Sequence, residues 1–176
     1  MYTDGIKVNL TEEEIKEAID WGKKNKDSPQ NVFPPWVFGK FGKYDENGTI
    51  FTKTCYLTCL GFFSAREYKS PDTSEVESFL SRDVLGITIT TFGSKADLLK
   101  KYRIVLKQGE KFIKPKKTTR RKVADPTAGF MGIPYYKFHI MGLFPYSEID
   151  PKGKTTVILI KDRGESRFEV DFSRYK

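Results

Sequence analysis

The sequence predicts an α+β fold in which an antiparallel, β-sandwich-like sheet in the C-terminal half is covered by two or three N-terminal helices. First, residues 84–172 hold about six segments that alternate in polarity or are rich in β-branched residues. Second, helix-like segments lie within residues 11–82 and form a helical front. Third, 176 residues with 38% hydrophobic and 14% aromatic content can bury one core, so we expect a single domain over residues 1–176.

The first predicted helix begins after Thr11. Thr11 and Glu14 have the spacing of a capping box, in which each side chain accepts a hydrogen bond from the backbone of the other residue. Acidic residues in the first turn and lysines near the end suit the helix dipole, so the helix should run to about Asn25. Its narrow apolar face consists of Ile15, Ala18 and Ile19. Ahead of it, residues 1–10 alternate and predict a strand-like arm.

Residues 27–47 predict an irregular connection. Its prolines exclude a long helix and its glycines mark turns. The segment is nevertheless too apolar for a free loop, because it contains Val32, Phe33, Trp36, Val37, Phe38 and Phe41. We therefore expect it to lie over the core. The tetrapeptide at 46–49, Glu-Asn-Gly-Thr, predicts a turn before the next element.

The stretch at 51–69 predicts the central helix, around which the rest of the chain is organised. It holds both cysteines and the longest apolar run of the sequence. With Thr54 as N-cap and helical residues from Cys55, the helix runs to Lys69 and should be largely buried. Helical spacing places one apolar face on Tyr56, Cys59, Leu60 and Phe63.

Gly61 lies in the middle of this predicted helix. Glycine costs about 1 kcal/mol relative to alanine inside a helix, so we expect another backbone to pack closely against it. The alternative is a threonine-rich strand over residues 51–58, because β-branched and aromatic residues also suit a sheet. The amphipathic continuation from Ser64 to Lys69 favours the helix.

A further capped helix is predicted from Asp72 to about Arg82, with Phe79 and Leu80 on its inner side. One helical turn is expected over residues 96–101. The predicted strands are 84–92, 102–107, 110–114, 135–143, 155–160 and 167–172. Gln108-Gly109 should form the hairpin turn between the second and third of them. Residues 115–123 are unpatterned, and 124–132 predict a turn-rich loop.

The positive charge of the chain is concentrated in one segment. Residues 100–122 contain eleven Lys and Arg against the single Glu110, a local net charge of +10 within a total of +8, so the remainder sums to −2. The candidate polyanion-binding residues are Lys114, Lys116, Lys117, Arg120, Arg121 and Lys122. If this segment binds nucleic acid, these side chains should converge on one face. The alternative is a solvated hairpin extension or a mobile loop, whose charges keep a sheet edge from pairing with other chains.

Cys55, Cys59 and His139 are the candidate metal ligands. Two thiols one helical turn apart with a distant histidine form a soft ligand set of the kind that copper-handling proteins use. The alternative, which we prefer, is that both cysteines are small hydrophobic residues of a buried helix. We therefore expect no metal and no cofactor, with His139 away from both thiols. A first-turn Cys55 should react faster than a buried Cys59.

Motifs of covalent catalysis and nucleotide binding are absent from the sequence. It contains no GxSxG, no HExxH, no P-loop and no dinucleotide fingerprint, so no catalytic residue is assigned and an enzyme is not favoured. No apolar run approaches the roughly 18 residues that span a bilayer, which predicts no transmembrane segment.

The order of four segments resembles that of uncharacterised bacterial exported proteins and lipoproteins. The segments are LTEEEIKEAIDWGKKNK, TKTCYLTCLGFFSAREYK, FPYSEIDPKG and the terminal FEVDFSRYK. In similar sequences a proline is expected where Cys55 stands, which indicates that this cysteine is not a shared feature. The resemblance implies no activity and no functional residue.

The resemblance implies an extracytoplasmic protein, periplasmic or lipid-anchored. We expect a non-enzymatic interaction or scaffold module whose partner is another protein or an anionic surface. The alternative is a cytoplasmic protein that binds nucleic acid or another polyanion through residues 114–122.

Overall fold

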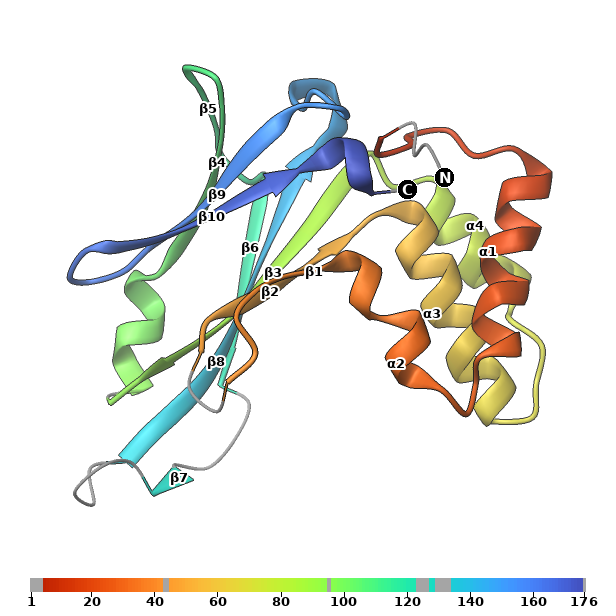
Figure 1. Cartoon of the computed structure of the whole chain (residues 1–176), viewed down its shortest axis with the longest axis horizontal. Helices are drawn as coiled ribbons and strands as arrows, with labels where there is room; N and C mark the ends of the chain where they lie inside the picture. Colours follow the sequence, from red (N-terminus) through yellow and green to blue (C-terminus); the bar gives the residue numbers. More distant parts are fainter. Residues whose placement is uncertain (1–4, 43–44, 95, 123–126, 129–133, 176) are drawn as a thin grey trace.

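The computed structural model describes residues 5–42, 45–94, 96–122, 127–128 and 134–175. It has three layers: a smaller sheet, a larger sheet and a group of helices on the far side of the larger sheet (Figure 1). The fold is α+β, as the sequence predicts, with antiparallel sheets and the longer helices in the N-terminal half. Among the described residues, no helix is both long and apolar enough to cross a membrane.

The larger sheet has the strand order β1-β2-β3-β8-β6, and β7 pairs with β8. The smaller sheet has the order β10-β9-β4-β5. All pairings are antiparallel. The strands are β1 (Val37–Gly39), β2 (Asn47–Phe51), β3 (Val84–Gly93), β4 (Arg103–Gln108), β5 (Lys111–Ile113), β6 (Lys117–Lys122), β7 (Thr127–Ala128), β8 (Pro134–Pro145), β9 (Lys154–Ile160) and β10 (Glu165–Asp171).

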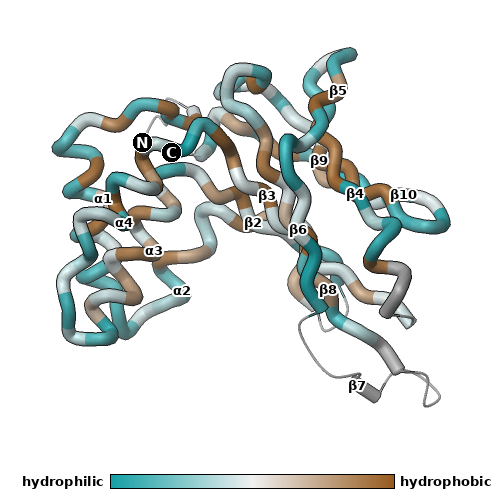
Figure 2. Tube along the Cα trace, turned by 180° about the vertical axis from the view of Figure 1, so that it is seen from behind, coloured by the Kyte–Doolittle hydropathy of each residue, from teal (hydrophilic) through white to brown (hydrophobic). Residues whose placement is uncertain are grey.

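The main core lies between the two sheets. Alternate residues of the long strands point into it, among them Ile87 of β3, Ile140 of β8 and Leu106 of β4, all fully buried. In Figure 2, β4 and β9 carry long hydrophobic stretches, whereas β6 at the edge of the larger sheet is hydrophilic. The alternation predicted for β10 is confirmed, because Val170 and the following Phe172 are buried in this core and Phe168 packs against it.

The helices are α1 (Glu12–Lys24), α2 (Pro29–Val32), α3 (Lys53–Arg66) and α4 (Thr73–Leu80). The capping box of α1 is confirmed in both directions, since Thr11 and Glu14 each accept from the backbone of the other. Helices α1 and α3 run side by side in the same direction (Figure 1). The close approach expected at Gly61 is confirmed, because a Cβ there would lie 2.2 Å from the carbonyl oxygen of Ile19.

A second apolar cluster joins the helices to the connection that precedes them. It is formed by buried Val32, Trp36, Cys55 and Phe62. The burial of Val32, Trp36 and Phe38 confirms that this part of the connection lies over the core, whereas Phe41 is 65% exposed. The connection contains α2, a 3₁₀ turn at Pro34–Trp36 and strand β1.

The predicted start and inner face of the central helix are wrong. Thr52, not Thr54, caps α3: its hydroxyl accepts a hydrogen bond from the backbone N–H of Cys55 at 3.0 Å. The helix therefore begins two residues earlier and ends at Arg66 rather than Lys69. Phe63, expected inside, is 52% exposed, whereas Phe62 is 1% exposed.

Three further expectations for local structure are corrected. Residues 46–49 do not form a turn, because Asn47–Phe51 is strand β2 paired with β3. Residues 5–10 form no strand. In the basic segment, which has no pattern in the sequence, Lys117–Lys122 forms the strand β6, so the mobile-loop alternative is wrong for these residues, although their charges do lie at a sheet edge. Most of the loop predicted at 124–132 lies outside the described residues.

Candidate functional site

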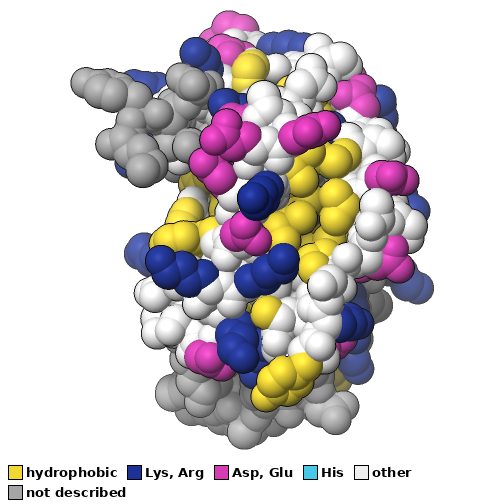
Figure 3. All heavy atoms as spheres, turned by 90° about the vertical axis from the view of Figure 1, so that its right-hand side faces the viewer, with side chains coloured by type: hydrophobic (Ala, Val, Ile, Leu, Met, Phe, Trp, Pro, Cys, Tyr) yellow, Lys and Arg dark blue, Asp and Glu magenta, His cyan; other side chains and the backbone are white. Residues whose placement is uncertain are grey.

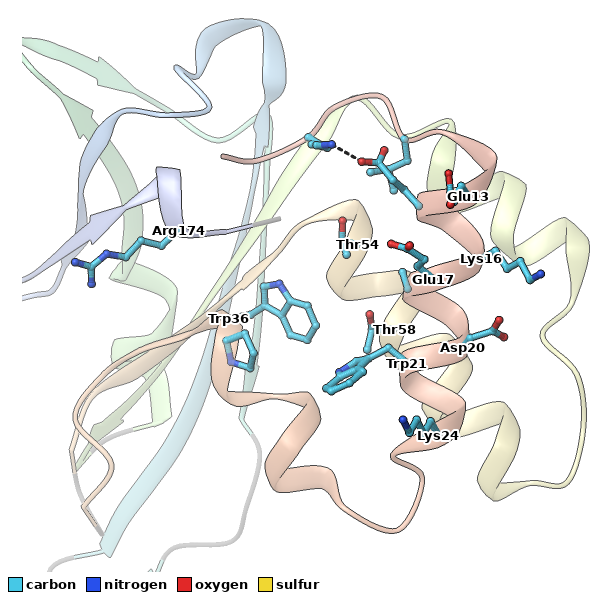
Figure 4. Close-up of a pocket in the computed structure, with 15 residues that line it drawn as sticks. Glu13, Lys16, Glu17, Asp20, Trp21, Lys24, Trp36, Thr54, Thr58 and Arg174 are labelled. Atoms are coloured by element: carbon cyan, nitrogen blue, oxygen red, sulfur yellow. Dashed lines mark hydrogen bonds and ion pairs between the residues drawn. The ribbon is translucent and has the colours of Figure 1, made fainter. Parts of the chain in front are cut away.

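The helical side of the molecule shows hydrophobic side chains gathered between acidic and basic ones (Figure 3). A cleft of about 830 Å³ lies where α1, the first turns of α3 and the Pro35-Trp36 turn meet. Figure 4 shows the residues that line it. A concave site of this size, mostly apolar with a few polar groups, is the usual form of a binding site.

The cleft owes its shape to local features of the sequence. The capping box fixes the start of α1, and an ion pair between Lys7 and Glu14 attaches the preceding segment to the first turn (Figure 4). The hydrogen bond from Lys7 lowers the pKa of Glu14, which keeps the carboxylate charged. Further along the helix, contact at Gly22 and Gly61 brings α1 against α3.

The interior of the cleft combines two indoles with one carboxylate. Trp21 of α1 and Trp36 point toward one another, and Glu17, one turn before Trp21, points to the same side (Figure 4). Thr54 and Thr58 of α3 form the back wall between them (Figure 4). No motif in the sequence marks these residues as a site.

Most other charged residues at the cleft do not point into it. Glu13, Lys16 and Asp20 point away from the cleft on the outer side of α1 (Figure 4). Arg174 also points away, on the opposite side (Figure 4). Glu17 is therefore the acidic residue best placed to contact a ligand bound in the cleft. Trp21 is 48% exposed, which is large for an indole and typical of residues that anchor a partner.

The basic segment has a different geometry from the one expected for polyanion binding. In β6, Lys117 and Arg121 pair with Leu143 and His139 of β8 and share one face of the sheet. Arg120 and Lys122 belong to the opposite face, and the Arg120 Nε donates to the carbonyl of Tyr102 at 2.9 Å. The prediction of one shared face is therefore wrong. Lys114 and Lys116 precede the strand and are exposed.

The candidate metal ligands are not brought together. Cys55 and Cys59 are free thiols on α3, whereas His139 is in the middle of β8, opposite Thr90 of β3. Across the described ranges, no three His, Cys, Asp or Glu residues are close enough to hold a metal ion. Burial lowers the pKa of His139, and the nearby charges of Lys137 and Arg121 lower it further.

The relative reactivity expected of the two thiols is reversed. Cys55 is a buried member of the cluster that it forms with Val32, Trp36 and Phe62 (the Trp36 cluster), whereas Cys59 is only partly buried. Burial raises the pKa of Cys55, and the hydrogen bond from Cys55 lowers the pKa of Cys59. We predict that iodoacetamide modifies Cys59 before Cys55 in the folded protein, as peptide mass spectrometry would show. Faster labelling of Cys55 would contradict this geometry.

A cluster around Glu46 joins the two sheets at their β1–β10 side. The Glu46 carboxylate accepts hydrogen bonds from the hydroxyls of Ser166 and Thr91, and Lys161 lies 3.3 Å from it. Lys161 also donates to the Ser166 hydroxyl at 2.8 Å. Burial alone would raise the pKa of Glu46, but these partners together lower it. A carboxylate held charged in this way is a weak base, so we assign the cluster a structural role.

The stabilising effect of Glu46 should depend on pH. Because its pKa is lowered in the folded state, its contribution is present above the unfolded pKa, about 4.3, and is lost as the pH falls through the folded value. We predict that Glu46→Gln costs about 1.5–3 kcal/mol of unfolding free energy at pH 7, since hydrogen bonds to a charged group are lost. The difference from wild type should shrink at pH 3, as urea unfolding would measure.

Glu165→Gln is the matched control for that experiment. Glu165 pairs with Arg167 on the surface of β10, where an ion pair contributes little. Its replacement should change the unfolding free energy by about 0.5 kcal/mol or less at pH 7. An equal loss from both substitutions would show that the Glu46 cluster does not hold the sheets together.

In comparisons with known proteins, the chain matches no family model, no curated protein and no solved structure.

Proposed function

We propose that this protein is a non-enzymatic interaction module that binds a basic segment of a partner polypeptide in the cleft between α1 and α3. The observation that carries the proposal is the position of the Glu17 carboxylate on the same side of α1 as Trp21, facing Trp36 (Figure 4). The charged end of a lysine or arginine side chain can form an ion pair with a carboxylate. Its aliphatic stem and its charge can also pack against the face of an indole ring.

A polypeptide fits this cleft better than a free small cation does. The cleft is open and about 830 Å³ in volume, which leaves space for apolar side chains on either side of a bound cation. Exposed tryptophan is enriched among the few residues that dominate protein interfaces. The described residues that line the cleft include no cluster of nucleophile, base and oxyanion donors, which supports a binding rather than a catalytic role.

An extracytoplasmic location is the other part of this proposal. It rests on the resemblance to bacterial exported proteins and lipoproteins. Fractionation of the source cells should place the protein outside the cytoplasm, and recovery in the cytoplasmic fraction would reject this part alone. Nucleic-acid binding through residues 114–122 stays a prediction, and the division of β6 between two faces does not favour it.

Selection from a displayed library of random decapeptides tests the occupant of the cleft. Peptides enriched on the wild-type protein should carry lysine or arginine next to apolar residues. Trp21→Ala should weaken the binding of the enriched peptides about thirtyfold or more, because truncating an anchor costs about 2 kcal/mol or more. Trp21 is largely outside the core, so the variant should keep the fold.

Two matched substitutions on α1 test whether the Glu17 carboxylate binds the cation of the peptide. Glu17→Gln should reduce the affinity for lysine-containing peptides, whereas Glu13→Gln, which makes the same change on a side chain that points away, should not. Enrichment of acidic peptides would overturn the proposal. Equal effects of the two substitutions would also overturn it, because they would show a general attraction to the acidic helix.

A further inference from the structure

A smaller cavity, separate from the cleft, lies between the larger sheet and the start of α3 and end of α4. Its volume is about 370 Å³, and Val84 and Leu143 contribute apolar surface from β3 and β8. Three cations also line it: Lys53 at the start of α3, Arg82 shortly after the end of α4, and Lys117 at the start of β6. No acidic residue is among the described residues that line it.

Lys53 is the unusual residue of this cavity. It is 8% exposed, and lysine is almost never so buried unless it is paired. Its Nζ donates to the carbonyl of Leu80 at 2.6 Å and lies 6.0 Å from the centre of the Tyr146 ring. Within the described part of the chain it forms no ion pair with a carboxylate. A buried ammonium with a single carbonyl partner can donate to a further acceptor.

The arginine of the cavity is held in place by aromatic rings. The Arg82 guanidinium lies 4.3 Å from the centre of the Phe79 ring, and Phe79 stacks on Tyr56 at 4.7 Å. Stacking leaves the edge of a guanidinium and its N–H groups free to meet an anion in a bidentate manner. Neither Arg82 nor Lys117 forms an ion pair with a carboxylate of the described residues.

Gly86 makes room for this arrangement on the surface of the sheet. A Cβ at Gly86 would lie 3.3 Å from the Tyr56 hydroxyl and 2.9 Å from the Met141 methyl group. The absence of a side chain lets Tyr56 and the Phe79 ring behind it lie close over β3. The cavity is thus shaped by the packing of Tyr56 and Phe79 over Gly86.

We propose that this cavity binds a small organic dianion of the phosphate-monoester type. A phosphate monoester carries about −1.5 to −2 charges at pH 7 and has several acceptor oxygens, which matches the three cations. The apolar surface of Val84 and Leu143 would receive its organic part. A volume of about 370 Å³ limits that part to a small group. This site is independent of the peptide cleft.

Calorimetric titration with phenyl phosphate, inorganic phosphate and phenol tests the proposal. Phenyl phosphate should bind with one site per chain and more tightly than inorganic phosphate, and phenol should not bind. Arg82→Ala and Lys117→Ala should each weaken phenyl phosphate about tenfold or more, since each removes a charged hydrogen-bond donor. Both residues are exposed at the rim, so these variants should fold.

Two further variants test the buried cation and provide a control: Lys53→Met removes the buried ammonium, and Lys116→Ala removes a charge outside the cavity. Lys53→Met keeps the length of the buried stem and should abolish binding. Lys116 is exposed next to Lys117 but does not line the cavity, so Lys116→Ala should leave the affinity unchanged. Equal losses from Lys116→Ala and Lys117→Ala would overturn the proposal, because they would indicate diffuse attraction.

Heparin and a duplex DNA of mixed sequence distinguish a polyanion from a small dianion. The cavity proposal is wrong if these polyanions bind and phenyl phosphate does not. In that case substitution of Lys114, Lys116 or Arg121, rather than of Lys53, should remove the binding of the polyanion. The basic segment would then be a polyanion site, with an affinity that falls steeply with salt.

Discussion

Replacing Gly22 with alanine is expected to destabilise the protein by about 3 kcal/mol. A Cβ at this position would lie 2.0 Å from the carbonyl oxygen of Thr58 and 2.7 Å from the backbone nitrogen of Phe62. Both are backbone atoms of α3, so no side-chain rotation can relieve the contact. The helices would have to separate, although alanine gains about 1 kcal/mol over glycine in helix propensity.

The effect of Gly22→Ala should be measured by urea unfolding, with Glu13→Ala as the control. Glu13 points away from the cleft on the same helix and should show only a small change (Figure 4). Separation of α1 from α3 would also widen the cleft, so peptides selected on the wild type should bind more weakly to Gly22→Ala. A stability equal to or above wild type would show that α1 and α3 are not in backbone contact.

The elements that the sequence predicted well are those with strong local signals. The capping box at Thr11 and Glu14 sets the start of α1 from adjacent residues alone. The β-branched alternation of β3 and the hairpin turn at Gly109, where φ is +57°, are equally local. Gly61 was predictable because a glycine inside a helix needs a packing reason.

The elements that were missed depend on partners far away in the sequence. Asn47-Gly48 has the composition of a turn, yet Gly48 lies in β2 because it pairs with Ile89 of β3. The close approach of the Phe38 ring, 2.2 Å from a Cβ at this position, explains why the residue is a glycine. Strand β6 has no alternation of its own, since it lies at an edge where both faces reach solvent. Its pairing with β8 decides its structure.

The candidate site was not predictable as a whole. The fold brings Trp21 and Trp36 together, and no pattern in the sequence links the two residues. One local signal was present: Glu17 and Trp21 are four residues apart on α1, so they share a side of the helix. The anion cavity takes Lys53, Arg82 and Lys117 from separate segments, which no sequence motif links.

The direct test of the corrected helix register is a pair of substitutions at neighbouring phenylalanines of α3. Phe62→Ala should cost about 3–5 kcal/mol of unfolding free energy, as truncation of a fully buried aromatic ring does. Phe62 is 1% exposed, belongs to the Trp36 cluster and packs edge-on against Phe33 at 5.5 Å. Urea unfolding of the two variants and the wild type measures the difference.

Phe63→Ala is the matched control, because it removes the same ring one position further along. Phe63 is 52% exposed and contacts Phe62 edge-on at 5.2 Å, so its loss should cost about 1 kcal/mol or less. A helix capped by Thr54, with Phe63 inside, predicts the opposite order. If Phe63→Ala were the more destabilising substitution, the buried face of α3 would be the one predicted from the sequence, with Tyr56, Cys59, Leu60 and Phe63 inside. Cys55 would then lie outside the Trp36 cluster, and the walls that α3 gives to the cleft and to the anion cavity would both be displaced.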